Sequence, residues 1–272
     1  MDQCGVQCIE ADVMDRHTLH EPLDMVDVVY NLASPPAGRD AGDYAKFNEV
    51  ALNNLLEEAN EHGVKMFVHL SCLDVYGTGG VIESTSVPRP VDEYQKSKLA
   101  AESLVMDFGR NHPDTKVRVV RASLALGPRD KTLTTSLLKM IESGKIVLPP
   151  GSSNAISLSH PKDVAQAMLK AAAYGGVWEQ FLVKSFDSSI EDFCRRTSVA
   201  TGRKADVKSG GFLSGKTLIP QYSADRIRAN RTIKEQEFWK KISYTPGYTI
   251  EKTVEEVSEW YRREPWLTKD LA

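Results

Sequence analysis

Short apolar runs alternate with longer amphipathic segments through the first half of the chain. The runs at 26–30, 66–71 and 116–122 have the length and the branched aliphatic content of buried strands. The segments at 43–62 and 92–110 lie between them, are rich in helix formers and predict helices. This alternation predicts βα units, and therefore an α/β fold with a parallel sheet.

The second half of the chain has a different pattern. Glycine and proline interrupt it at 127–128 and 149–151, and a further short strand is predicted at 181–184. Beyond that strand the pattern is largely helical, so this region is predicted to contribute mainly helices.

Composition indicates one globular unit of enzyme size and excludes several classes of protein. The chain has 272 residues, of which 41% are hydrophobic and 26% charged, and its net charge is -3. This charge gives no reason to expect nucleic acid or an anionic membrane as a partner. No apolar stretch reaches the roughly 18 residues that a membrane helix needs, and no basic segment with an apolar core opens the sequence. We predict a cytoplasmic protein.

The cysteines indicate neither disulfides nor a metal. Four cysteines, at positions 4, 8, 72 and 194, are too few and too scattered for a disulfide framework. Cys4 and Cys8 lie near His17 and His20, but their spacing differs from that of a zinc finger. We therefore predict reduced thiols and no metal ion.

The pentapeptide from Tyr94 to Lys98 is the strongest candidate for chemistry. Residues four apart are neighbours on a helix surface, so the phenol and the ammonium share one face. A tyrosine has an ordinary pKa of about 10 and becomes a useful base only when a cation stabilises its phenolate. Asp92 is suited to cap this helix, which places both side chains in its first turns. Upstream, Ser71 and Cys72 end an apolar run, and ligands of open α/β sheets bind at the carboxyl ends of the strands.

Several segments, in order, make the chain similar to a known family. They are Asp12-Val13, Asn31 to Ser34, Asn48 to Leu56 with Gly63 to Lys65, Ser71 to Gly77, Tyr94 to Lys98, Arg121 to Pro128 and Leu158 to Ala165. With them the chain resembles the extended short-chain dehydrogenase/reductase family, in its NAD-dependent epimerase/dehydratase branch. The resemblance implies a Rossmann-like doubly wound parallel sheet with a smaller, mostly helical substrate domain. It assigns 1–131 and 156–184 to the dinucleotide-binding part, and 132–155 and 185–272 to the substrate-binding part.

The resemblance also implies a cofactor, NAD or NADP, and a set of residues that contact it. These are Asp12, Val13, Asn31, Leu32, Ala33, Asn48, Tyr94 and Lys98. Tyr94, as a phenolate, would remove the hydroxyl proton of a secondary alcohol while hydride leaves the same carbon, and Lys98 would lower the pKa of Tyr94. Ser71 or Cys72 would hold the substrate oxygen. Further substrate contacts are assigned to Asp74, Tyr76 and Arg129, and family members commonly form homodimers through helices that correspond to 43–62 and 92–110.

The sequence departs from the family pattern where the cofactor phosphates would bind. The family opens with a strand, a Gly-x-x-Gly-x-x-Gly turn and a helix whose N-terminus holds the pyrophosphate, and this sequence has none of them. Met1 falls just before the expected third strand, at 6–11. Either the natural start lies upstream, or this is a shortened form that binds the cofactor poorly.

Three further departures concern the substrate. Cys72 stands where the family usually has Ser or Thr, and a thiol is a weaker hydrogen-bond donor. Only Asp74 remains of the Thr-Asp-Glu stretch of the dehydratases, which argues against a full dehydratase. Ile156 replaces the Arg that holds the substrate diphosphate in nucleotide-sugar epimerases. Candidates to replace that clamp are Arg121, Arg129, Arg226, Arg228 and Arg231.

Three functional hypotheses follow. The leading one is an NAD(P)-dependent, epimerase/dehydratase-like oxidoreductase that acts on a sugar, nucleotide-linked in the preferred version, or on another secondary alcohol or ketone. The alternative is a catalytically weak or inactive cofactor-binding or regulatory relative. A third is a P-loop NTPase, since Gly210 to Thr217 fits that loop letter for letter. The polar residues at 204–208 and Pro220 argue against the strand and helix that such a loop needs.

Overall fold

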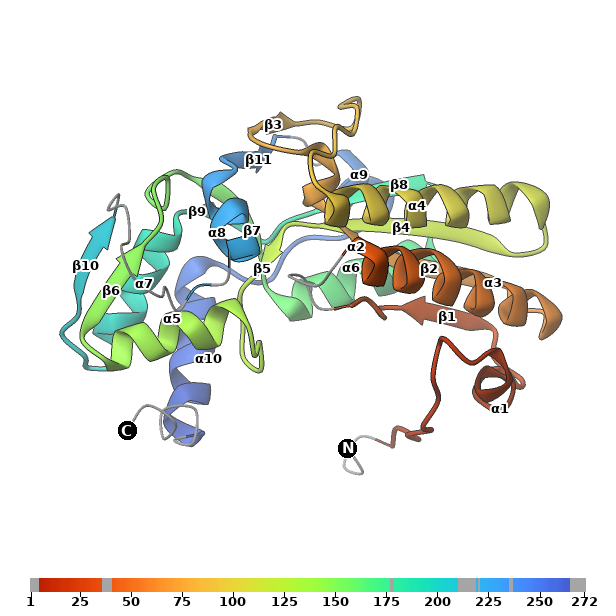
Figure 1. Ribbon diagram of the computed structural model, residues 1–272, viewed down its shortest axis with the longest axis horizontal. Coiled ribbons are helices and arrows are strands. Elements are labelled where there is room, and N and C mark those ends of the chain that lie inside the picture. Colours follow the sequence, from red (N-terminus) through yellow and green to blue (C-terminus); the bar gives the residue numbers. More distant parts are fainter. Residues whose placement is uncertain are drawn as a thin grey trace.

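A parallel sheet of four strands organises the region that the sequence predicts to bind a dinucleotide (Figure 1). A computed structural model of the protein describes residues 5–35, 41–176, 179–209, 219, 221–234 and 237–264. The sheet has the order β1-β2-β4-β8, and its neighbouring strands are parallel. Its strands are β1 (Val28–Asn31), β2 (Met66–Cys72), β4 (Lys116–Ala122) and β8 (Glu179–Val183). The four strands predicted from the apolar runs are therefore confirmed as the central sheet.

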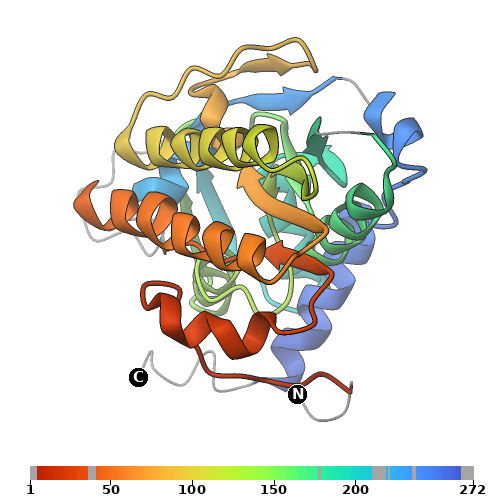
Figure 2. The same cartoon turned by 90° about the vertical axis from the view of Figure 1, so that its right-hand side faces the viewer.

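Helices cover both faces of this sheet (Figure 2). On one face, α3 (Leu52–Glu61) and α4 (Glu93–Asn111) lie side by side, and Phe67 of β2 packs among their apolar side chains. On the other face, α6 (Pro161–Ala173) packs against Val68 of β2. Because successive residues of a strand point to opposite faces, one strand contributes to both cores. The sheet is doubly wound, as predicted.

Helix α4 begins where the sequence predicts. Asp92 is its N-cap, and the Asp92 carboxylate accepts the backbone N–H of Gln95 at 2.7 Å. Further along, the helix comes close to β4 because Gly109 has no side chain. A methyl group at Gly109 would lie 2.5 Å from Cγ2 of Val117, which is too close for two carbons. The cap and this contact together fix the position of the helix that carries Tyr94 and Lys98.

The helix predicted at 43–62 is interrupted by a π-helical turn. It consists of α2 (Ala41–Ala45), the π-helical segment η3 (Lys46–Ala51) and α3. The turn buries Asn48, whose Nδ2 donates to Oγ of Ser97 on α4 at 2.9 Å. Single π-helical turns occur frequently at functional sites.

A second core joins elements from 124–158 with elements from the C-terminal third of the chain. Leu137, Phe193 and Val257 are fully buried in it. Its helices are α5 (Leu133–Glu142), α7 (Ile190–Ala200), α8 (Gln221–Arg228) and α10 (Ile250–Arg263). Its strands are β5 (Leu124–Ala125), β6 (Lys145–Leu148), β7 (Ile156–Ser159), β9 (Phe186–Ser188) and β10 (Asp206–Ser209). The remaining elements are η2 (Arg16–Leu19), α1 (His20–Leu23), η4 (Leu73–Tyr76), β3 (Gly80–Ile82), β11 (Arg231–Ile233) and α9 (Glu237–Lys241).

The sequence prediction for the region after 184 was incomplete. Besides helices, this region supplies β9, β10 and β11, which pair with β7, β6 and β3 respectively. These strands are only three or four residues long and partly polar, so they have no apolar period that would reveal them. Each forms because an earlier strand offers it a hydrogen-bonding edge.

The strand predicted at 6–11 is wrong. These residues are exposed and have no regular secondary structure, although four of the six, Val6, Cys8, Ile9 and Ala11, are apolar. A strand is stable only beside a partner, and in the described part of the chain β1, the edge of the four-stranded sheet, pairs with β2 and not with this segment. The apolar pattern alone therefore does not form the strand.

Two other predictions concern a membrane and a phosphate loop. Within the described ranges, every helix is too short or too polar to cross a membrane. The segment from Gly210 to Thr217, which resembles a P-loop, lies outside the described residues.

Candidate active site

A cavity of about 200 Å³ opens at the carboxyl end of β2. Ser71 and Cys72, the last two residues of β2, line it together with Tyr94 and Lys98 from the first turns of α4. The structure thus brings the predicted catalytic residues to one place. A larger cavity of about 600 Å³ adjoins this one and shares four lining residues with it: Asp74, Tyr94, Arg226 and Arg231.

Tyr94 is half-buried between an arginine and a second tyrosine. The guanidinium carbon of Arg226 lies 5.0 Å from the centre of the Tyr94 ring, and the Tyr44 ring meets it edge-on at 5.3 Å. Burial raises the pKa of Tyr94 well above its ordinary value, and the neighbouring Cys72 adds to the rise. Arg226 opposes this shift without cancelling it. The phenol therefore stays protonated at neutral pH in the protein alone.

Lys98 is a buried ammonium that faces the cavity. Only 2% of the residue is exposed, and its Nζ donates to the backbone oxygen of Leu70 at 3.1 Å. Burial lowers the pKa of Lys98, while the neighbouring Cys72 and Glu102 partly oppose this shift. An ammonium has three N–H donors, so further donors remain for a ligand.

The two candidates for holding a substrate oxygen differ in their surroundings. The Ser71 hydroxyl donates to Oε1 of Glu102 at 2.5 Å, so its proton is committed to a buried carboxylate. Burial and the nearby Asp74 raise the pKa of the Cys72 thiol to about 11. Cys72 is therefore a protonated, weak donor at neutral pH.

Glu102 is a buried acid that the sequence analysis did not single out. It pairs with Arg121, whose Nη2 lies 2.5 Å from Oε2 of Glu102, and both side chains are at most 5% exposed. Arg121 also donates to the Tyr76 hydroxyl at 2.6 Å. Arg121 and Tyr76 line neither cavity and are engaged with the protein itself, whereas Ser71 joins this network to the smaller cavity.

Asp74 forms a second buried ion-pair network, with two arginines from a distant part of the chain. Its Oδ2 lies 2.5 Å from Nη2 of Arg226 on α8, and its Oδ1 accepts from Arg231 on β11. Burial favours the protonated carboxyl, but the charges of Arg226 and Arg231 outweigh this effect and lower the pKa of Asp74. The network closes one side of both cavities.

Four of the predicted cofactor contacts gather in a small pocket beside β1. Val13, Asn31, Ala33 and Asn48 line it. The Asn31 side chain shapes its own loop, because Oδ1 accepts the backbone N–H of Ala33 at 3.0 Å and Nδ2 lies 3.1 Å from Nδ1 of the buried His69. Leu32 instead lines the cavity of about 200 Å³ at the end of β2, and the residue is 58% exposed.

The model of the NAD dependent epimerase/dehydratase family matches residues 2–182. The chain belongs to this family. Three relatives illustrate its range. YbjS of Escherichia coli K12 is 21% identical over 293 residues, with 96% of this chain and 86% of that protein covered. The UDP-glucose 4-epimerase of Vibrio cholerae is 29% identical over 232 residues, covering 79% of this chain and 69% of that protein. Human sterol-4-alpha-carboxylate 3-dehydrogenase, decarboxylating, is 25% identical over 180 residues, covering 63% of this chain but only 48% of that enzyme.

Solved structures of epimerases and of the protein RMD share the fold. A UDP-glucose 4-epimerase from Thermotoga maritima with UDP-glucose has a TM-score of 0.80 at 19% identity, covering 94% of this chain and 84% of that one. RMD from Pseudomonas aeruginosa, complexed with NADPH, has a TM-score of 0.78 at 18% identity, covering 94% and 90%. The predicted fold is confirmed. The predicted cofactor, NAD or NADP, agrees with the NAD dependence of the family.

The residues present fit the nicotinamide end of such a cofactor. Among the described residues Lys98 donates only to Leu70, so its ammonium has further N–H donors to offer in a cavity that Tyr94 and Leu32 also line. Asp12 is exposed and accepts the backbone N–H of Met14 at 2.9 Å, so in the protein alone it shapes a turn. Its adenine contact stays a prediction.

Arg129 and Tyr76 lie away from the cavities. Arg129 is exposed, has a positive φ of 67° and lines neither cavity described above. Tyr76 is buried against Arg121. The structure therefore brings Asp74, but not these two, to the site. Arg226 and Arg231, two of the arginines weighed as a diphosphate clamp, occupy it instead.

Proposed function

We propose that the protein is an NAD(P)-dependent oxidoreductase or epimerase that acts on a nucleotide-linked sugar. The observation that carries this proposal is the meeting of Tyr94 and Lys98 in one cavity, at the end of a parallel strand, in a chain of the NAD dependent epimerase/dehydratase family. A bound nicotinamide would supply the hydride acceptor and donor.

Tyr94 is the proton acceptor in this proposal. It takes the proton of a substrate hydroxyl, and Lys98 supplies the charge that stabilises the resulting phenolate. Burial raises the pKa of Tyr94 in the protein alone. Lys98 must therefore lower this pKa only after a bound ligand has changed the surroundings of the phenol. The buried ammonium can turn from the Leu70 carbonyl, to which it makes a single hydrogen bond, toward the cavity.

The arginines at the larger cavity support a substrate with a diphosphate. Arg226, Arg228 and Arg231 all line it, and the planar guanidinium suits phosphate oxygens. The relatives include a UDP-glucose 4-epimerase, whose name specifies a nucleotide sugar. They also include sterol dehydrogenases, so a sterol is the alternative substrate to assay beside a nucleotide sugar.

A second candidate function is a cofactor-binding or regulatory relative with little activity. One observation favours it: the ion pair of Asp74 with Arg226 lines both cavities and engages two charged side chains of the site with each other.

The substitution Tyr94→Phe separates the two candidates. We expect wild-type protein to bind NADH or NADPH and to interconvert UDP-glucose and UDP-galactose. Turnover by Tyr94→Phe should fall about 10²- to 10⁴-fold, because the proton acceptor is lost. NADH fluorescence should show that cofactor affinity is retained.

Tyr248→Phe is the matched control, because it also removes a tyrosine hydroxyl. That hydroxyl donates to Glu256 on α10, and Tyr248 lines neither cavity. Equal turnover of Tyr94→Phe and wild type would remove Tyr94 from the mechanism. Cofactor binding without turnover of either a nucleotide sugar or a sterol would favour the second candidate.

A further inference from the structure

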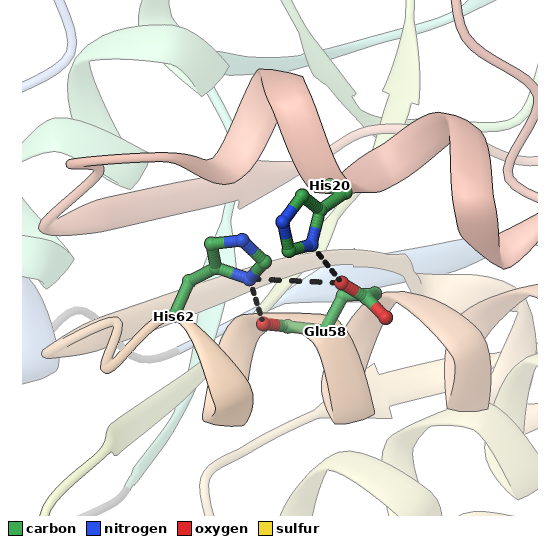
Figure 3. Close-up of side chains that lie close together, drawn as sticks. All are labelled: His20, Glu58 and His62. Carbon is green, nitrogen blue, oxygen red and sulfur yellow. Dashed lines mark hydrogen bonds and ion pairs between the residues drawn. The ribbon is translucent and has the colours of Figure 1, made fainter.

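Two histidines and a glutamate meet just beneath the surface, outside both cavities, and only His20 is exposed (Figure 3). His20 is the first residue of α1, Glu58 lies on α3, and His62 is the C-cap of α3. Glu58 and His62 are four residues apart and so share one face of the helix. The two imidazole rings lie 4.5 Å apart, nearly at right angles, above the Glu58 carboxylate.

The geometry of the three side chains is close to that of a metal site. Nδ1 of His20 and Nδ1 of His62 each lie 3.6 Å from Oε2 of Glu58. One ligand atom from each residue lies within 4.8 Å of the other two. Ligands at about 2.0–2.1 Å from a tetrahedral zinc ion lie about 3.3 Å from one another, so a small movement completes the site. The His20 side chain is 76% exposed and has the room to make it.

The Glu58 carboxylate has one oxygen that needs a partner. Its side chain is only 7% exposed, and Oε1 accepts from Nε of Arg16 at 2.5 Å. The other oxygen, Oε2, is buried and has no hydrogen-bond partner within the described ranges. A buried carboxylate oxygen without a partner is unfavourable, and this one faces the two imidazoles. The oxygen therefore marks a place for a cation.

Hydrogen bonding already orients one of the histidines. Nδ1 of His62 lies 2.9 Å from the backbone oxygen of Glu58, within hydrogen-bonding distance. A neutral imidazole that donates from Nδ1 keeps the lone pair of Nε2 for a metal, and metal-binding histidines are commonly held in this way. Nε2 is therefore the ligand atom of His62, and the 3.6 Å between its Nδ1 and Oε2 of Glu58 is a contact between side chains, not a ligand separation.

The local charge also favours a cation. Arg16 is surrounded by Glu57 at 2.8 Å, Glu58 at 2.5 Å and Glu61 at 2.5 Å. These carboxylates outnumber the single guanidinium among them, so the surroundings remain negative.

We propose that His20, Glu58 and His62 bind a divalent transition-metal ion, with zinc as the best fit and water as the fourth ligand. Two imidazoles and one carboxylate match the ligand preference of zinc, whereas magnesium and calcium prefer oxygen ligands alone. The ion would tie α1 to the end of α3. This proposal is independent of the proposed function, because none of the three residues lines either cavity. It also revises the prediction of no metal, which weighed His20 only with Cys4, Cys8 and His17.

Isothermal titration of the untagged, chelator-treated full chain with zinc tests the proposal. We expect one zinc ion per chain and weaker binding by about tenfold or more for His20→Ala, Glu58→Gln and His62→Ala. Magnesium and calcium should not compete. With cobalt as the probe, wild-type protein should show the visible absorption of a tetrahedral ion, and His20→Ala should lose it. Because His20 is exposed, its loss leaves the fold intact.

Two control variants separate a built site from surface binding. His17→Ala removes an exposed histidine from the neighbouring turn. His112→Ala removes a histidine whose Nδ1 lies 3.0 Å from the Phe108 oxygen at the end of α4, the same arrangement as His62 on α3. Both variants should bind zinc as wild type does. The proposal is overturned if wild type binds no zinc, or if His20→Ala binds it as tightly as wild type.

Discussion

At the scale of single residues, the site is controlled by charges that are buried in pairs. Asp74 pairs with Arg226 and Arg231, and Glu102 pairs with Arg121. Removal of one partner leaves the other charge buried and uncompensated, which costs far more than an exposed pair contributes. These carboxylates therefore matter to stability as well as to the site.

Asp74→Asn should destabilise the protein strongly at neutral pH. The loss should be about 3–5 kcal/mol in the free energy of unfolding, because two arginines lose their buried counter-charge. The folded-state pKa of Asp74 is lowered, so its contribution is complete above the unfolded value of about 4 and is lost as the pH falls through the folded value. Urea unfolding of both proteins from neutral to acid pH measures the difference, which should shrink below about pH 4.

Asp107→Asn is the matched control. The pair of Asp107 with Arg110 on α4 is exposed, and its removal should cost about 1 kcal/mol or less. A loss for Asp74→Asn no larger than that of the control would contradict the role given to the buried network.

At the scale of elements, helix α4 positions the chemistry. Its first turns carry Tyr94 and Lys98, and its middle carries Glu102, which holds Ser71. The capping aspartate Asp92 determines where the helix begins. A change at the cap therefore acts on stability and on the position of Tyr94 together.

Asp92→Ala should lower the free energy of unfolding by about 1 kcal/mol, since the N–H of Gln95 loses its acceptor. Asp92→Ser should restore most of this loss, because serine is also a good N-cap. Asp114→Ala, in the exposed turn that precedes β4, is the control and should change little. Thermal and urea unfolding measure the effect. Equal stability of Asp92→Ala and wild type would show that the cap does not determine the start of α4.

At the scale of the whole molecule, α3 and α4 form an outer layer that the family resemblance assigns to a homodimer. Val50 lies in the π-helical turn that precedes α3, and half of its surface is exposed (50%). A dimer built on this layer would bury that valine, and a charge there would oppose it.

Size-exclusion chromatography with light scattering should find wild type as a dimer and Val50→Lys as a folded monomer. Val199→Lys is the control, because Val199 is 81% exposed on α7, outside this layer. A wild-type monomer over the whole accessible concentration range would contradict the dimer.

The sequence predicted the central elements because apolar residues are concentrated in them. The strands β2 and β4 are buried on both faces, and this concentration identifies them without tertiary information although each also contains buried polar residues. The Tyr94–Lys98 spacing likewise predicted a shared helix face, because that relation is local. The same reasoning failed at 6–11, where apolar residues lie in an exposed segment that pairs with none of the described strands.

The amino-acid sequence by itself determined the order of the four central strands and of the helices α3 and α4 between them, the cap at Asp92 and the local pairing of Tyr94 with Lys98. Only the tertiary structure decided which distant side chains meet: Asp74 with Arg226 and Arg231, Ser71 with Glu102, and His20 with Glu58 and His62. The reason is physical. Helix period and capping depend on neighbours within a turn, whereas a buried charge takes whichever partner the packing of remote elements brings to it.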